Sequence, residues 1–205
     1  MSADDAVVAR ALADLKSAGG AILIDLEFTC WEDSLRTRWA DPARPAEVIE
    51  IGLAAWDVRT GAVGASFSAL VRPRVNPTLS AYCLDLVHIP QGEIDAAEGL
   101  PVALGHVVTW LRALPGDRVP TCGWGTIDRV GLAANVRALG AADPFDARPH
   151  FDLCAVMTAL RRRPQPVSRG ELRALADLPA NPRRHRALDD ALDLVHFLAL
   201  LLASR

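Results

Sequence analysis

The chain has 205 residues, enough for one domain or two small ones, and 51% of them are hydrophobic, which allows a large core. Its formal net charge of −3 excludes a generally basic nucleic-acid-binding protein, so any such contact must come from local basic patches or bound metal ions. The four cysteines form no C-x-x-C pair and indicate neither a zinc site nor a disulfide framework, so reduced thiols in a cytoplasmic protein are the simpler interpretation.

The two ends of the chain show no pattern typical of export or of membrane insertion. Residues 1–20 are acidic early and lack a long apolar run, which does not fit a signal peptide. The longest apolar stretch, residues 194–203, is too short to span a bilayer and favours the buried face of a last helix. We therefore expect a cytoplasmic protein with no membrane partner.

The first half of the chain predicts one helix and three strands. The helix covers residues 5–17, and Gly19 and Gly20 follow its end. The first strand is a continuous apolar run, typical of a strand buried on both faces. The next two are joined by a tight turn at residues 59–61 and should pair as an antiparallel hairpin. In chain order the strands cover residues 21–28, 47–58 and 62–73. Loops are expected at 31–46 and, with a short helix, at 76–92.

The second half alternates strands with helices, the pattern of an α/β domain. Strands are expected at residues 118–124 and 148–154, and the second runs directly into a helix. Pro115 and Gly116 should end the helix that precedes the first of them. The remaining helices are expected at residues 100–114, 127–140, 169–178 and 188–204. No repeat or linker divides the chain, so we predict one domain over residues 1–205, with an N-terminal helix and lead-in at 1–20 and the core at 21–204.

Two acidic residues lie at the end of the first strand, in the segment AILIDLEFTCWEDS (residues 21–34). Side chains alternate between the two faces of a strand, so Asp25 and Glu27 project from the same face. Two adjacent carboxylates repel each other unless a divalent cation neutralises them, and Mg²⁺ or Mn²⁺ prefers such oxygen ligands. Taken alone, however, the pair is more often explained as strand-end acids that meet solvent.

Two further groups of residues could contribute to the same site. Asp128 falls near the start of a helix, directly after an expected strand, and could also be an ordinary helix-start acid. His185 precedes Asp190 by five residues, and Asp190 lies in the first turn of the last expected helix. The pKa of a loop histidine suits a general base near neutral pH. A surface histidine followed by helix-capping acids would give the same pattern.

Taken in chain order, these residues resemble the DEDDh 3′–5′ exonucleases, a family with a ribonuclease-H-like fold. Four acids of the chain match the four acids of that family, and the segment HRALDDA at residues 185–191 has the form typical of it. The matching acids are Asp25, Glu27, Asp128 and Asp190, and His185 matches the family histidine.

Three segments are similar to one branch of that family, the Eri-1-like enzymes, which act on RNA 3′ ends. They are DLEFTCWE, EVIEIG (47–52) and VRPRVNPTLSAYCLDLVHIPQGEID (71–95). The resemblance runs from Ala21 to Phe197. Val87 and His88 stand where the branch usually has Thr-Gly, in a segment that lies near the terminal nucleotide in its members.

The resemblance implies a fold and a reaction. The fold would be a three-layer α/β domain of the ribonuclease-H-like type, with a mixed five-stranded central sheet that includes an antiparallel hairpin and with helices on both faces. The reaction would be hydrolysis of phosphodiester bonds at the 3′ ends of single-stranded or 3′-overhanging nucleic acid, RNA being favoured, with release of nucleoside 5′-monophosphates. A DNA 3′–5′ exonuclease of the proofreading or repair type is the alternative. A catalytically inactive binding module is less compatible, because all five site residues are present.

The resemblance also implies roles for individual residues. Two Mg²⁺ or Mn²⁺ ions would be bound, with Asp25 bridging both, Glu27 and Asp190 completing the shell of the first, and Asp128 holding the second. His185 would accept the proton of the attacking water. The implied contacts to the terminal nucleotide are Phe28, Thr29 and Ile89. Apart from the resemblance, Trp31 and Trp39 lie in the polar loop after the first strand and could stack on bases. Arg183, Arg184 and Arg186 flank His185 and are candidates for phosphate contacts, although a solvated arginine is the more common explanation.

Overall fold

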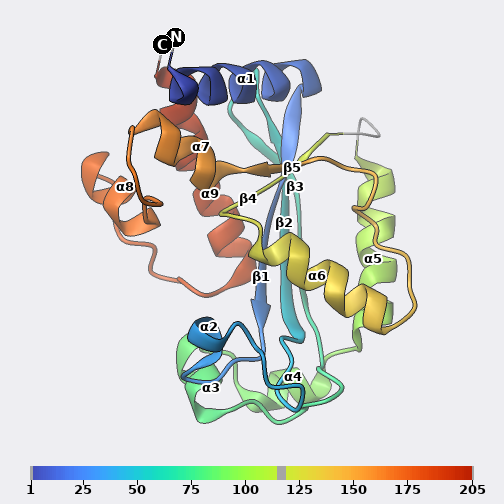
Figure 1. Cartoon of the computed structure of the whole chain (residues 1–205). Helices are drawn as coiled ribbons and strands as arrows, with labels where there is room; N and C mark the ends of the chain where they lie inside the picture. Colours follow the sequence, from blue (N-terminus) through green and yellow to red (C-terminus); the bar gives the residue numbers. More distant parts are fainter. Residues whose placement is uncertain (1, 115–118, 205) are drawn as a thin grey trace.

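The computed structural model describes residues 2–114 and 119–204 and is built around one five-stranded sheet (Figure 1). The strand order is β3-β2-β1-β4-β5. The first three strands pair antiparallel, and the last two continue the sheet in parallel. The strands are β1 (Gly20–Phe28), β2 (Val48–Asp57), β3 (Val63–Leu70), β4 (Thr121–Gly123) and β5 (His150–Asp152). The predicted mixed sheet with an antiparallel hairpin is confirmed.

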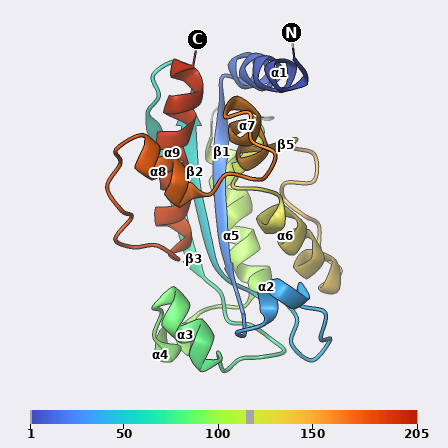
Figure 2. The same cartoon turned by 60° about the vertical axis from the view of Figure 1, so that its left-hand side comes forward.

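Helices cover both faces of the sheet, as the resemblance implied (Figure 1). One face carries α1 (Ala3–Ala18), α7 (Leu153–Leu160), α8 (Arg169–Leu175) and α9 (Ala187–Ala203). The other carries α5 (Leu100–Ala113) and α6 (Ile127–Ala138). Three short helices lie beyond the end of the sheet to which β1 points (Figure 2): α2 (Ser34–Thr37), α3 (Ala81–Val87) and α4 (Gln91–Ala96). Among the described helices, none combines the length and the apolar character needed to cross a membrane.

The central strand β1 is buried along its whole length and divides the core into two layers. Leu23 packs in one cluster with residues of α7 and α9, whereas Ile24 packs in another with residues of α5 and α6. By the same alternation, Asp25 and Glu27 project on the α9 side. The predicted burial of this strand on both faces is confirmed, and its acids are fixed by the strand that organises the whole core.

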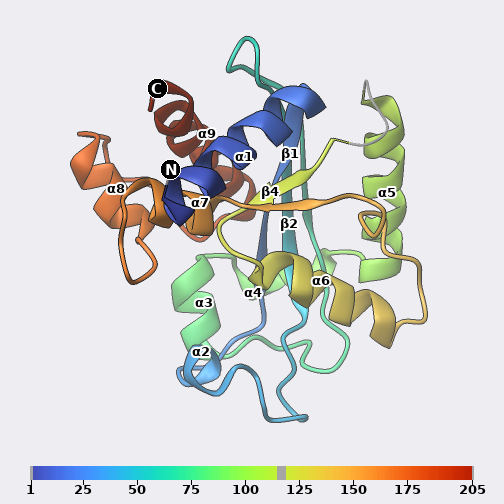
Figure 3. The same cartoon turned by 45° about the horizontal axis from the view of Figure 1, so that its top comes forward.

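Helix α1 begins two residues before the predicted start and is part of the core. The Ser2 hydroxyl accepts a hydrogen bond from the Asp5 backbone N–H at 3.1 Å, and the Asp5 carboxylate accepts one from the Ser2 N–H at 2.9 Å. This reciprocal cap satisfies two free donors at the helix start, which explains the earlier beginning. Leu12 and Leu15 are buried in the same cluster as α7 and α9, and Figure 3 shows α1 lying across α7.

β3 ends at Leu70 rather than at residue 73, and the two parallel strands are also shorter than predicted, each with a local cause. β4 covers only part of the predicted 118–124, because Pro120 has no N–H to extend the ladder. β5 covers only part of 148–154, because the Asp152 carboxylate accepts from the Ala155 N–H at 2.9 Å and starts α7. The predicted loop at 31–46 contains the one-turn helix α2. The predicted helix end at residues 115 and 116 lies outside the described residues.

Candidate active site

Buried acids from three elements converge at the end of β1. Asp25 and Glu27 end the strand, Asp128 lies in the first turn of α6, and Asp190 lies in the first turn of α9. All four line one cavity of about 640 Å³, and His185 lines it with them. The structure thus brings together the five residues that the sequence singled out, from positions as far apart as 25 and 190.

The two helical acids are held by backbone groups of neighbouring segments. Asp128 Oδ1 accepts a hydrogen bond from the Leu26 N–H at 3.2 Å, which ties α6 to β1 between the two strand acids. Asp190 accepts from the His185 N–H at 3.0 Å and from Asn181 Nδ2 at 2.9 Å. These bonds fix the loop before α9 against the helix. Both acids lie at helix N-termini, where the helix dipole stabilises a negative charge.

His185 lies beside the acids in a backbone conformation that few side chains adopt. Its φ is 64°, in the left-handed region, and its ring is half-buried. A ring nitrogen of His185 and carboxylate oxygens of Glu27 and Asp190 all lie within 4.8 Å of one another. Burial, together with the nearby Arg184 guanidinium, lowers the pKa of His185, so its imidazole is neutral at pH 7 and can accept a proton.

Burial and mutual repulsion make the acid cluster strongly unfavourable when fully ionised. Burial and the neighbouring Asp128 raise the pKa of Asp25 well above its ordinary value. Burial, with Asp190 and Glu50 nearby, raises the pKa of Glu27 to about 8, and burial raises that of Asp128 to about 6. Four carboxylates and one imidazole in a buried pocket are a donor set that fits Mg²⁺ or Mn²⁺, since a bound cation offsets this repulsion.

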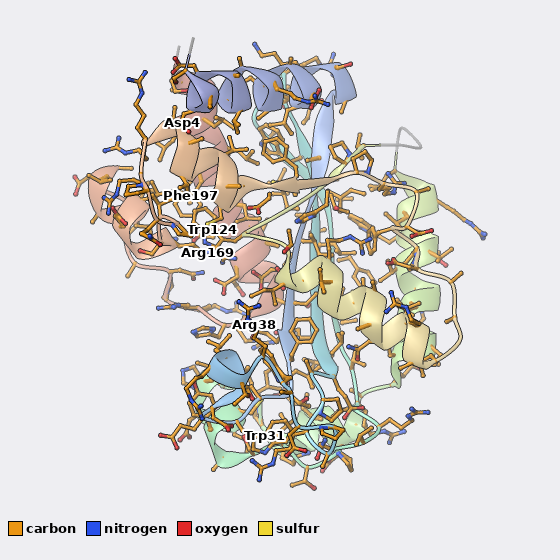
Figure 4. The ribbon with its side chains drawn as sticks, in the orientation of Figure 1. Asp4, Trp31, Arg38, Trp124, Arg169 and Phe197 are labelled. Atoms are coloured by element: carbon orange, nitrogen blue, oxygen red, sulfur yellow. The ribbon has the colours of Figure 1, made fainter. Side chains whose placement is uncertain are left out.

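Arg169 touches the acid cluster directly, a contact that the sequence analysis did not predict. It is the first residue of α8, and its Nη2 donates to Asp25 Oδ1 at 2.7 Å. Its Nη1 lies 3.6 Å from Asp190 Oδ1. The guanidinium also lies over the Trp124 ring, 5.8 Å from its centroid. Figure 4 labels both residues, which lie next to each other. The sequence around Arg169 shows no motif that would predict its contact with an acid 144 residues earlier.

Glu50 is a second residue whose importance only the structure shows. It lies directly across from Glu27 on β2 and is 1% exposed. Its carboxylate accepts from the Ala187 N–H at 3.0 Å and from Nε and Nη2 of Arg186 at 3.0 to 3.2 Å. The Arg186 guanidinium is thus paired with Glu50 through Nε and Nη2, and a contact of Arg186 with a phosphate stays a prediction. Glu50 therefore holds the start of α9 against the sheet.

The residues implied as nucleotide contacts have structural partners of their own. Phe28 is buried on the α6 side and packs edge-on against Trp39, with ring centroids 6.5 Å apart. The Thr29 hydroxyl donates to the Pro45 carbonyl at 2.8 Å, and its backbone carbonyl accepts from Trp39 Nε1 at 2.7 Å. Ile89 is buried in a third cluster near α3. Contact of Phe28, Thr29 or Ile89 with a nucleotide stays a prediction.

The two departures from the family pattern, Val87 and His88, lie at the end of α3. Val87 is fully buried. His88 ends α3 with φ 54°, in the left-handed region that glycine adopts freely. Trp31 lies in this same region of the molecule (Figure 4), with the Arg44 guanidinium 5.6 Å from its ring centroid.

The fold and the site together define a known class of nuclease. A family model described as exonuclease, RNase T, matches residues 22–198. The chain therefore belongs to the RNase T exonuclease family, and its four acids and histidine follow the DEDDh pattern. Members of this type are typically metal-dependent.

Curated relatives are exonucleases that act at 3′ ends. ERI1 exoribonuclease 2 of Danio rerio is 36% identical over 137 residues, which are 67% of this chain and 20% of the relative. The 3′–5′ exonuclease crn-4 of Caenorhabditis elegans is 27% identical over 192 residues, 86% of this chain and 61% of the relative. The chain thus spans between a fifth and about three fifths of these two proteins.

Solved structures of this class share the fold. The crystal structure of cell-death related nuclease 4 (CRN-4) superposes with a TM-score of 0.77 at 26% identity, covering 90% of this chain and 64% of that chain. The nuclease domain of 3′hExo, a DEDDh family member bound to rAMP, superposes with a TM-score of 0.78 at 22% identity, covering 90% of this chain and 92% of that chain. The predicted ribonuclease-H-like fold is confirmed.

Proposed function

We propose that the chain is a metal-dependent 3′–5′ exonuclease that removes nucleotides from the 3′ ends of RNA and releases nucleoside 5′-monophosphates. The observation that carries this proposal is the convergence of four buried acids and a neutral histidine on one cavity, in a chain of an exonuclease family. An all-acid cluster with a single base is suited to hydrolysis of an anionic phosphodiester, where charge must be neutralised and water activated.

Four residues would hold the metal: Asp25, Glu27, Asp128 and Asp190. Bound divalent cations supply the positive charge that stabilises the phosphoryl oxygens and the leaving 3′-oxygen, and they lower the pKa of water. The arrangement of the acids on rigid elements supports this role, since all four lie in a strand or a helix that packs in the core. We propose two ions, Mg²⁺ or Mn²⁺, because four carboxylates balance two divalent charges.

His185 would act as the general base that accepts the proton of the attacking water. Its lowered pKa keeps the ring neutral at pH 7, and a ring nitrogen faces Glu27 and Asp190. The hydrogen bond from its own backbone N–H to Asp190 fixes the loop while leaving the ring free to reach the cavity.

RNA is the favoured substrate because the curated relatives include proteins named as exoribonucleases. DNA is the second candidate, because two other relatives, Snipper of Drosophila melanogaster and crn-4, are named only as 3′–5′ exonucleases. The residues that distinguish the ribose 2′-hydroxyl are few and come from loops.

One assay tests the activity and the substrate together. RNA and DNA oligomers of one sequence, labelled at the 5′ end, are incubated side by side with Mg²⁺ or Mn²⁺. We expect stepwise shortening from the 3′ end, faster for RNA, and no shortening in EDTA. A large preference for DNA would replace the RNA proposal by the DNA one.

The matched variants are Asp190→Asn and Asp189→Asn, neighbours in the first turn of α9. Asp190 is buried in the cluster, whereas Asp189 forms an ion pair with Arg183 outside it. Asp190→Asn should lower kcat about a thousandfold, because a metal acid contributes several kcal/mol to the transition state. Asp189→Asn should retain the wild-type rate. Full activity of Asp190→Asn, with its fold verified by circular dichroism, would refute the site.

A further inference from the structure

Arg169 brings a positive charge into the acid cluster, and none of the roles above uses it. Its guanidinium bonds to Asp25 at 2.7 Å and lies 3.6 Å from an Asp190 carboxylate oxygen. Among the ion pairs of the described residues, only those of Arg169 involve any of the four acids. Arg173 and Arg186, two other arginines near the site, are paired with Asp193 and Glu50, and Arg184 lines the cavity beside His185.

The contact with Asp25 conflicts with metal binding. It uses an oxygen of the carboxylate that would be shared by the cations, and a guanidinium and a divalent ion repel each other at such short range. Two divalent cations would balance the charge of the four carboxylates, and Arg169 would then lose its counter-charge. Since an arginine is always ionised, its guanidinium needs another anion.

The surroundings of Arg169 fix its backbone and place a flat aromatic surface beside its side chain. The backbone is fixed at the start of α8, where the Ser168 hydroxyl accepts from the Glu171 N–H at 3.1 Å. Trp124 offers a flat surface under the guanidinium and is itself fixed by packing against Phe197, with ring centroids 5.1 Å apart. Both Arg169 and Trp124 line the cavity that would receive the substrate. The forked guanidinium is suited to bind two oxygens of a phosphate.

We propose that Arg169 is an exchangeable counter-ion: it neutralises Asp25 until divalent cations bind, and it then turns along the Trp124 face to bind the phosphate of the 3′-terminal nucleotide. This role rests on the proposed function for the identity of the phosphate. It makes Arg169 a competitor of the metal and a ligand of the substrate at the same time.

The test compares Arg169→Met with wild type in two binding measurements that need no turnover. The first is the Kd for Mn²⁺, measured by titration calorimetry on protein stripped with EDTA. The second is the Kd for adenosine 5′-monophosphate on Mn²⁺-saturated protein. We expect Mn²⁺ to bind about tenfold more tightly to the variant, and the nucleotide about tenfold more weakly, as one charge-assisted hydrogen bond predicts. General damage to the site would weaken both.

Two further variants keep the result interpretable. Arg163→Met removes an arginine from a carboxylate of the same helix, Glu171, that does not line the cavity, so it should leave the Mn²⁺ affinity unchanged. Arg169→Lys keeps the charge and should retain the wild-type Mn²⁺ affinity. Unchanged or weaker Mn²⁺ binding by Arg169→Met would overturn the proposal, as would unchanged nucleotide binding. Both shifts in a protein without nuclease activity would uphold the exchange and reject the exonuclease instead.

Discussion

At the scale of single residues, the site is a set of acids whose ionisation opposes folding. Glu27 has its pKa raised from 4.5 to about 8, with burial as the main cause, and Asp128 has its pKa raised from 3.8 to about 6. An acid with a raised pKa binds its proton more tightly in the folded protein. Its contribution to stability is therefore complete below the unfolded pKa and is lost as the pH rises through the folded pKa.

This linkage predicts that, in EDTA, the protein loses stability as the pH rises from about 4.5 to about 8. Glu27→Gln should flatten the decline, because the amide cannot ionise. Guanidinium unfolding midpoints at intervals of pH measure the effect. A wild-type protein that becomes more stable over this range would contradict the assignment of Glu27 as a buried, repelled acid.

At the scale of elements, the site depends on how closely α9 approaches β2. Gly52 lies across from Asp25, and a Cβ at Gly52 would come within 2.1 Å of the Ala187 carbonyl carbon and 2.2 Å of the Leu188 nitrogen. The helix that carries Asp190 thus begins in direct contact with the strand backbone. Only a residue without a side chain fits there.

Gly52→Ala should therefore move the start of α9 and separate Asp190 from the strand acids. We expect a loss of stability of about 3 kcal/mol and a fall in activity, because the atoms in the way are backbone and cannot rotate aside. Gly64→Ala is the control on β3, since its nearest atom would be the Ala55 carbonyl oxygen at 3.8 Å. Equal behaviour of the two variants in denaturant midpoints and rates would exclude this tight approach.

The elements also show what a sequence can and cannot reveal. The period of two along β1 correctly placed Asp25 and Glu27 on one face, because that property is local. Arg169 bonds to an acid 144 residues earlier in the chain, and Asn181 reaches Asp190 from an irregular loop. The alternation of side chains along one strand predicts neither contact. Glu50 could have been noticed as an acid inside the apolar run VIEIG, but its partner Arg186 could not.

At the scale of the whole molecule, the acids join the two layers of the fold. Asp128 belongs to α6 on one face of the sheet, Asp190 to α9 on the other, and β1 lies between them (Figure 1). A cation bound by all of them would connect three elements that otherwise meet only through apolar packing and a few hydrogen bonds. Metal binding should therefore stabilise the entire domain.

Mn²⁺ at a hundred times its Kd should raise Tm by about 5 to 10 °C, since binding to the folded state alone adds about 2.7 kcal/mol. EDTA should reverse the rise. Asp190→Asn should show a much smaller increase than Asp189→Asn when both are followed by differential scanning calorimetry. An equal increase in the two variants would mean that the stabilising ion binds elsewhere.

The pairing of Glu27 with Glu50 across two strands also limits how the sequence can change over evolutionary time. Like charges directly opposite each other destabilise a sheet, and here Arg186 neutralises one of them. Replacement of Arg186 alone would leave Glu50 as an unpaired buried charge beside a metal acid, and replacement of Glu50 alone would leave the arginine without its partner. Positions 50 and 186 should consequently accept substitutions together more readily than singly. Active homologues that differ from this sequence at one of the two positions should therefore differ at the other as well.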